Sequence, residues 1–198
     1  MSNPDLHLAS ASQRRRELLT SLGLSFTFGG VDADESSLPG EAVSEMVLRL
    51  ATLKARTAFD SGAYTVPVLG ADTVVVLDDR VFGKPGSKEE ALAMLASLSG
   101  RAHEVLTGVA VVSNGECQTA VSLTEVRFRE IHPDEALAYW QSGEPAGKAG
   151  AYAVQGLGGI FVSAIRGSYS GVVGLPVFET AELLRGAGIQ LPAIADHR

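Results

Sequence analysis

Cysteine is nearly absent from this sequence, and it contains neither a long apolar run nor a surplus of basic residues. Cys117 is the single cysteine among 198 residues, so no internal disulfide can form. The four histidines are scattered without the short spacings of a zinc site. No stretch is apolar enough to cross a bilayer, and the first residues do not resemble a signal peptide. We therefore expect a cytoplasmic protein with no membrane partner.

The charge of the chain argues against a nucleic-acid partner. It carries 16 basic and 23 acidic residues, which gives a formal net charge of −7. Nonspecific affinity for nucleic acid comes from basic patches that neutralise phosphates, so we expect no such partner. One basic run does occur, at residues 14–16, which are all arginine. In an acidic protein this run favours a small anionic ligand.

The order of elements along the chain predicts an α/β fold. There is no internal repeat and no linker, so we predict one domain over residues 1–198. Helices are expected after Ser12, over 41–59, from Ser87 to Gly100, over 133–140 and over 177–184. Strands are expected at 6–9, 66–77, 81–82, 104–112, 119–129, 152–155, 160–165 and 172–173. Hairpins mixed with crossover helices imply a mixed sheet.

The first junction between strand and helix contains Ser10, Ser12, Arg14 and Arg15. It places two hydroxyls, backbone N–H groups and two guanidiniums around the positive end of a helix dipole, which suits a polyphosphate. A second interpretation is that Ser12 only caps the helix and the arginines lie on a solvated face. The motif alone leaves both interpretations open.

Two charged residues interrupt apolar patterns further along. Lys54 falls on the apolar face of the predicted helix at 41–59, so its ammonium either reaches an anion or extends to water. Asp72 interrupts the apolar segment VLGADTVVVL. A carboxylate there is costly unless a cation, a metal or a reacting water lies beside it, although hydrogen bonds from backbone N–H groups are an alternative. Glu35, in an acidic run, is a candidate second carboxylate for a divalent cation.

Two further candidates rest on weaker patterns. Lys84, in Gly83-Lys84-Pro85, follows the turn after the predicted Asp72 strand and adds a positive charge at that edge. Gln155 precedes a run of glycines at 156, 158 and 159. Its amide has a donor and an acceptor for a base edge, but such a residue is more often ordinary surface. The glycines permit either close approach of a ligand or a tight turn.

Taken together, six segments resemble the Maf family of nucleotide pyrophosphatases over essentially the whole chain. They are LASASQRRRELL, DADE, LGADTVV, FGKP, KAGAYAVQG and GSYSGVVGLP. The resemblance implies an elongated α/β fold with a mixed, strongly bent sheet, flanking helices and a central cleft, similar to inosine triphosphate pyrophosphatases. It also implies a divalent metal, Mg²⁺ or Mn²⁺, and a homodimer. Gln13 departs from the family pattern, which usually has proline there.

The same resemblance assigns roles to residues. Asp72 is implied as the catalytic proton acceptor and, with Glu35, as a metal ligand. The residues implied to contact the substrate are Ser10, Ser12, Arg14, Arg15, Lys54, Thr73, Lys84 and Gln155. Of these, Arg14, Thr73 and Gln155 resemble the branch that acts on dTTP and UTP. A glutamine amide can pair with the ring N–H and the carbonyl of uracil or thymine, which agrees with that branch.

The expected function is therefore hydrolysis of dTTP and UTP to the monophosphate and pyrophosphate, which would remove unwanted or modified nucleotides. One alternative is a pyrophosphatase for 7-methyl-GTP or for purine triphosphates. Another is a nucleotide-sensing module without turnover, linked to cell division through a partner.

Overall fold

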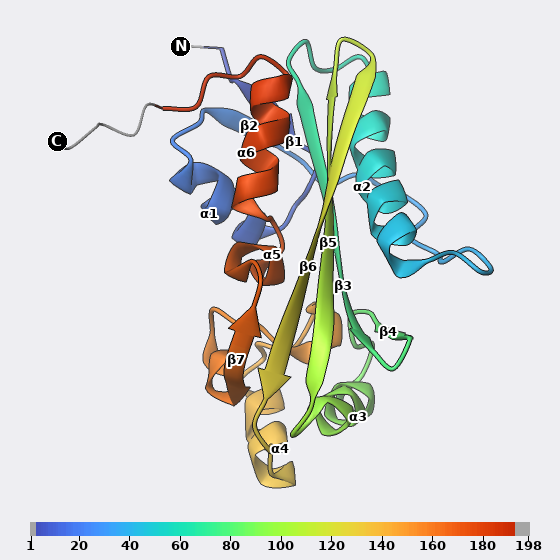
Figure 1. Ribbon diagram of the computed structural model, residues 1–198, viewed down its shortest axis with the longest axis vertical. Coiled ribbons are helices and arrows are strands. Elements are labelled where there is room, and N and C mark those ends of the chain that lie inside the picture. The colour runs from blue at the N-terminus through green and yellow to red at the C-terminus, as the bar shows by residue number, and fades with distance from the viewer. Residues whose placement is uncertain (1–2, 193–198) are drawn as a thin grey trace, which may run out of the picture. The chain divides into compact units, whose positions relative to one another are not determined.

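The computed structural model of the protein describes residues 3–192 (Figure 1). Helices and strands are interleaved along this part of the chain. They are β1 (Leu6–Leu8), α1 (Gln13–Ser21), β2 (Phe26–Phe28), α2 (Val43–Asp60), β3 (Val68–Leu77), β4 (Arg80–Phe82), α3 (Lys88–Leu98), β5 (Ala102–Ser113), β6 (Glu116–Phe128), α4 (Pro133–Gln141), η1 (Ala149–Ala151), η2 (Leu157–Phe161), β7 (Val162–Arg166), α5 (Tyr169–Val173) and α6 (Val177–Gly186). Among these described helices, none has the length and apolar character needed to span a membrane.

The strands of residues 3–192 form a seven-stranded mixed sheet. Their order is β2-β1-β3-β5-β6-β7, and β4 pairs with β3. Strand β1 runs parallel to β2 and to β3, whereas β4 is antiparallel to β3 and β7 is antiparallel to β6. The predicted mixed α/β fold with helices flanking the sheet is confirmed.

The chain divides into two compact units. Unit 1 comprises the described residues up to Asp72, the segment Gly108–Val121 and the described residues from Gly174. Unit 2 comprises Thr73–Thr107 and Ser122–Val173. Strands β3, β5 and β6 each continue from one unit into the other. Each unit has its own apolar core.

Unit 1 has helices on both faces of its strands, with α2 on one side and α1 and α6 on the other (Figure 1). Because successive side chains of a strand point to opposite faces, alternate residues enter different cores. The core on the side of α1 and α6 includes Leu6, Leu8, Leu19, Leu69, Ala71, Val109, Val111 and Leu184. The core on the side of α2 consists mostly of small residues, namely Ala9, Ala51, Ala55, Ala58, Val68, Ala110 and Val112.

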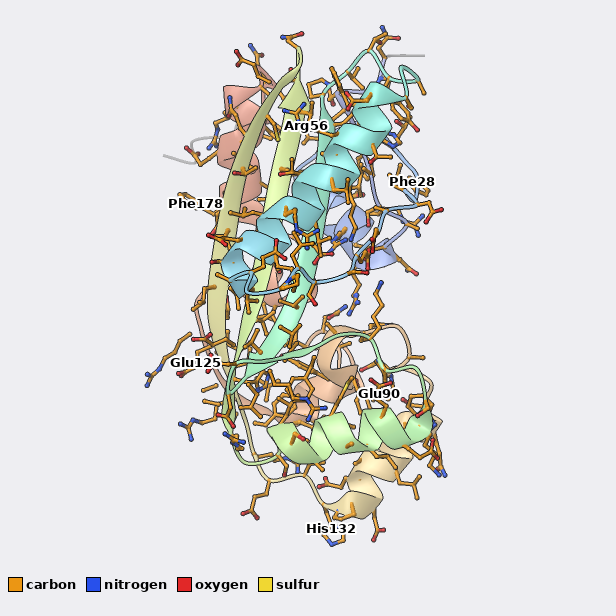
Figure 2. All side chains as sticks on the ribbon, turned by 90° about the vertical axis from the view of Figure 1, so that its right-hand side faces the viewer. Phe28, Arg56, Glu90, Glu125, His132 and Phe178 are labelled. Carbon is orange, nitrogen blue, oxygen red and sulfur yellow. The ribbon has the colours of Figure 1, made fainter. Side chains whose placement is uncertain are left out.

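Two glycines allow α2 to lie very close to the sheet. A Cβ atom on Gly70 of β3 would lie 2.3 Å from the carbonyl oxygen of Ala51. A Cβ atom on Gly108 of β5 would lie 2.4 Å from the carbonyl oxygen of Val47. Neither position has room for a side chain, so the backbones of helix and strand touch directly. Figure 2 looks onto this side of the unit, where α2 crosses in front of the strands.

Unit 2 is built around a larger aromatic core. Its fully buried side chains include Phe128 and Phe161, and it receives Val75 from β3, Leu95 from α3 and Tyr139 from α4. Helices α3 and α4 of this unit both have capped N-termini. The Ser87 hydroxyl accepts a hydrogen bond from the Glu90 N–H at 3.1 Å, and His132 caps α4. Glu90 and His132 are labelled in Figure 2.

The predicted hairpin is confirmed, whereas part of the glycine-rich region was predicted wrongly. Asn114 and Gly115 both have positive φ, 52° and 83°, as a two-residue turn between β5 and β6 requires. The strand expected at 152–155 is absent; Gln155 lies in a turn. The strand expected at 172–173 is helix α5, because the Ser168 hydroxyl accepts a hydrogen bond from the Gly171 N–H at 3.0 Å and starts a helical turn. Strand β2 was not predicted.

Candidate functional site

The loop after β1 gathers polar groups at the start of α1. Ser10 is buried, with 8% of its surface exposed, and its Oγ accepts the N–H of Ser12 at 3.2 Å. Ser12 occupies the N-cap position of α1, but its side chain makes no capping hydrogen bond. The first turn of α1 contains no acidic residue, so no carboxylate there offsets the positive end of the helix dipole. This arrangement suits an anion.

Arg15 connects this loop to a distant segment of unit 1. Its Nε donates to the carbonyl oxygen of Gly174 at 2.8 Å, and its NH1 donates to Ser10 Oγ at 3.3 Å. Burial lowers the pKa of the Arg15 guanidinium, the charge of Asp72 raises it, the charge of Arg14 lowers it again and that of Glu35 raises it. The arginine therefore fixes the loop and lies within electrostatic range of both predicted carboxylates.

Lys54 joins the two predicted carboxylates. Its Nζ lies 2.6 Å from Asp72 Oδ1 and 2.6 Å from Glu35 Oε1. The side chains of Lys54 and Asp72 are each 10% exposed, whereas that of Glu35 is 47% exposed. The sequence placed Lys54 on the inner face of its helix and left its partner undetermined. The structure identifies that partner as the Asp72 carboxylate, with Glu35 sharing the same ammonium.

The close helix packing at Gly70 explains this geometry. Gly70 and Asp72 are two residues apart on β3 and so lie on the same face, toward α2. Ala51 and Lys54 are three apart on α2 and so lie on one face of the helix. The contact between Gly70 and Ala51 thus sets the distance between Asp72 and Lys54. A side chain at position 70 would separate the ion pair.

Arg49 holds the loop that carries Glu35, a role the sequence analysis missed. Its Nε lies 2.5 Å from Glu41 Oε1, and its NH2 lies 2.8 Å from Glu41 Oε2 and 3.0 Å from the carbonyl oxygen of Ser36. Asp34 accepts hydrogen bonds from the backbone N–H and the hydroxyl of Ser36. The acidic run is therefore an ordered loop tied to α2. Glu41 precedes the helix, so no helical spacing in the sequence could have indicated the pair.

The remaining predicted residues lie at the start of α1 or in unit 2. Arg14 is half-buried in the first turn of α1, while the Gln13 side chain donates to Glu17 at 2.8 Å on the exposed face of that helix. In unit 2, Thr73 Oγ1 lies 2.9 Å from Thr107 Oγ1, which donates to the carbonyl oxygen of Gly171. Lys84 is exposed between β4 and α3, and Gln155 is exposed in its turn.

The metal-binding capacity of unit 1 rests on two carboxylates. Among residues 3–192, no group of three or more histidine, cysteine or acidic side chains could hold a metal by itself. Glu35 and Asp72 nevertheless meet at one cation, the Lys54 ammonium, which lies 2.6 Å from an oxygen of each. Mg²⁺ is commonly held by one or two carboxylates together with substrate phosphates. Glu35 and Asp72 are therefore of the residue type and number that such a cation uses.

Comparisons with known proteins identify the family of the chain. The family model described as "Maf-like protein" matches residues 5–187. A protein of Bordetella avium (strain 197N) named dTTP/UTP pyrophosphatase is 53% identical over 197 residues, covering 96% of this chain and 98% of its own. A protein of the same name from Pseudoalteromonas translucida (strain TAC 125) is 51% identical over 180 residues, covering 91% and 95%.

Among solved structures, the Staphylococcus aureus Ham1 protein is similar with a TM-score of 0.42 and 16% identity. The similarity covers 62% of this chain and 71% of that chain.

Proposed function

This chain belongs to the Maf-like protein family, and on that basis we propose that it is a nucleoside triphosphate pyrophosphatase that hydrolyses dTTP and UTP. Its relatives from Bordetella avium and Pseudoalteromonas translucida are named for that activity and match nearly the whole of the chain. The observation that carries the proposal is the buried Lys54–Asp72 pair shared with Glu35, next to an arginine that also bonds the Ser10 loop.

The phosphate chain is bound by the cations and N–H groups of the α1 loop. Ser10, Ser12 and the first turn of α1 supply hydroxyl and backbone donors, and Arg14 and Arg15 supply charge. Lys84 is a further phosphate-binding cation that the resemblance to the family implies. Arginine and lysine contacts to phosphoryl oxygens stabilise the charge that develops on the leaving pyrophosphate.

Asp72 activates the attacking water. The water oxygen attacks the α-phosphorus and its proton passes to the Asp72 carboxylate, while the bond from the α-phosphorus to the α,β-bridging oxygen breaks. The products are a nucleoside monophosphate and pyrophosphate, and the bridging oxygen leaves with the pyrophosphate. Lys54 holds one carboxylate oxygen at 2.6 Å, which fixes the direction from which Asp72 can accept the proton.

Glu35 and Asp72 are the residues that would hold a divalent cation, Mg²⁺ or Mn²⁺. Such a cation, when bound with the substrate, supplies positive charge that offsets the negative charge of the triphosphate. Arg49 keeps Glu35 in place for this role through its bonds to Glu41 and Ser36.

Base selection is assigned to Gln155, with Arg14 and Thr73. The Gln155 amide can donate to a carbonyl of uracil or thymine and accept from the ring N–H. Gln155 is exposed, so it is accessible to a ligand. Removal of unwanted or modified pyrimidine nucleotides from the cytoplasm, by a homodimer, is the proposed role in the cell.

The experiment is pyrophosphate release by the purified protein with Mg²⁺ or Mn²⁺ over dTTP, UTP, CTP, 7-methyl-GTP and ITP. The Asp72→Asn variant is expected to lose several orders of magnitude in turnover with an unchanged far-UV circular dichroism spectrum. Asp78→Asn is the matched control, because Asp78 is exposed, pairs with Arg101 and has a left-handed φ of 50° that asparagine tolerates.

The results of this experiment distinguish the proposed activity from the other substrate classes and from a binding module without turnover. Preferred turnover of dTTP and UTP that is lost only in Asp72→Asn supports the proposal. Preference for 7-methyl-GTP or ITP would replace it with the other substrate class. A thermal shift with dTTP but no pyrophosphate would indicate a binding module without turnover.

A further inference from the structure

A partly buried carboxylate outside the proposed chemistry organises the turn that carries Gln155. Glu144 follows α4 in the chain, and its two carboxylate oxygens accept three hydrogen bonds within unit 2. Oε1 accepts from the Tyr139 hydroxyl at 2.7 Å and from the Gly158 N–H at 2.9 Å. Oε2 accepts from the Leu157 N–H at 3.0 Å. Two of these three donors are backbone groups just after Gln155.

Tyr139 extends the same network to the other side of Gln155. Its hydroxyl oxygen accepts the Ala153 N–H at 3.1 Å while its proton is donated to Glu144. The backbone is therefore held two residues before Gln155 and two residues after it. The Cα–Cβ bond of Gln155 therefore has a defined origin and direction, although the side chain beyond it is exposed.

The glycines of this turn leave room for the side chains of Glu144 and Tyr139. A Cβ atom on Gly156 would lie 2.1 Å from Glu144 Oε2, and one on Gly158 would lie 2.5 Å from the Tyr139 hydroxyl. The sequence leaves open whether these glycines permit ligand approach or a tight turn. They admit the Glu144 carboxylate and Tyr139 against the backbone.

The network favours an ionised Glu144. Burial by itself would raise the pKa of this carboxyl, but hydrogen bonds from Gly158, Tyr139 and Leu157 outweigh burial and lower the pKa. An ionised carboxylate offers only acceptors, and all three of its partners here are donors. An amide at position 144 would present its NH₂ group to at least one donor.

We infer that Glu144 is a positioning residue for base selection: it fixes the 155–159 turn so that the Gln155 amide meets the pyrimidine edge in one orientation. The inference rests on the proposed function and deepens it. A carboxylate that only stabilised unit 2 would affect all nucleotides equally, whereas a positioning residue affects the substrates that the Gln155 amide distinguishes.

The test compares UTP with CTP, which differ only at the ring positions that a glutamine amide reads. Glu144→Gln is expected to lower the ratio of kcat/KM for UTP to that for CTP by about tenfold, mainly through a higher KM for UTP. Hydrogen exchange at the Leu157 and Gly158 amides should become faster in the same variant. Tyr139→Phe, which keeps the ring but loses the hydroxyl, should change the ratio in the same direction.

Glu135→Gln is the matched control. Glu135 also lies in or near α4 and accepts hydrogen bonds, from Arg129 and from the His132 N–H, but none from the Gln155 turn. The Glu135→Gln variant should be less stable than the wild type, but its ratio of kcat/KM for UTP to that for CTP should not change. Wild-type protein without UTP turnover would overturn the proposed function and this inference with it. Normal UTP turnover with an unchanged ratio in Glu144→Gln and Tyr139→Phe would overturn the inference alone.

Discussion

Replacing Gly70 by alanine should separate the Lys54–Asp72 pair without changing either charged residue. The added Cβ would lie 2.3 Å from the carbonyl oxygen of Ala51 and 2.8 Å from the backbone nitrogen of Ala55. A carbon atom approaches a carbonyl oxygen to about 3.3 Å at closest. Helix α2 must therefore move outward by about 1 Å, because both neighbouring atoms belong to its backbone.

Two measurable effects follow from this displacement. Overpacking of this kind costs about 1–3 kcal/mol of the free energy of unfolding. For a chain of this length, that corresponds to a decrease in Tm of roughly 5 °C, measured by calorimetry. Lys54 moves with the helix away from Asp72, and a misplacement of about 1 Å in a catalytic group can lower turnover about 100-fold.

Gly86→Ala provides the matched comparison. The nearest atom to a Cβ at position 86 is a Glu90 side-chain oxygen at 3.4 Å, an ordinary contact. Both variants change the entropy of the unfolded chain equally. A Gly70→Ala protein with the Tm and turnover of Gly86→Ala would refute the argument that helix packing sets the ion-pair distance.

Two other substitutions test buried charges. Lys54→Met leaves the buried Asp72 carboxylate beside Glu35 without its ammonium, so the free energy of unfolding should fall by about 3 kcal/mol in urea titrations. Adding Asp72→Asn should recover part of that loss, and strictly additive effects would contradict the pairing. Burial lowers the pKa of His103 to about 4 from 6.5, so the unfolded chain takes up this proton first as pH falls. The contribution of neutral His103 to the free energy of unfolding should therefore be fully present above pH 6.5. The free energy of unfolding should decrease by up to about 3 kcal/mol as the pH falls toward 4, and it should decrease less in the His103→Gln variant.

Periodicity in the sequence predicted the elements that bury one clear face. The alternating apolar residues of β5 and β6 around Asn114-Gly115, and the apolar stripe of α2, are local patterns, and the structure confirms both. The secondary structure of the glycine-rich region after Gly143 was harder to predict from the sequence. Its conformation depends on Glu144 and Tyr139, which are separate in sequence from the turn they hold. A strand-like run of residues became turns and 3-10 segments there.

The sequence predicted which residues belong to the charged site, but it did not predict which of them form hydrogen bonds or ion pairs with one another. Asp72 and Lys54 stood out because each breaks an apolar pattern, and they form an ion pair. Nothing in the sequence indicates that Glu35 would share that ammonium, or that Arg49 would tie down the loop. The contact of Lys54 with Asp72 depends on how closely α2 approaches the sheet, and Gly70 and Gly108 permit that approach. Whether the other predicted residues contact a nucleotide stays a prediction.

The interleaving of the two units along the chain affects the order in which a growing polypeptide can fold. The ribosome delivers residues from the N-terminus, and the last segment of unit 2 ends at Val173. The core on the side of α1 and α6 in unit 1 still lacks Leu184 and Ile189 at that point, although its first strand was made at the beginning. Domains generally fold as units once their residues are available, so unit 2 can be completed first. A chain that stops before α6 would contain Lys54, Asp72 and the core on the side of α2, but not the complete core on the opposite face of the sheet.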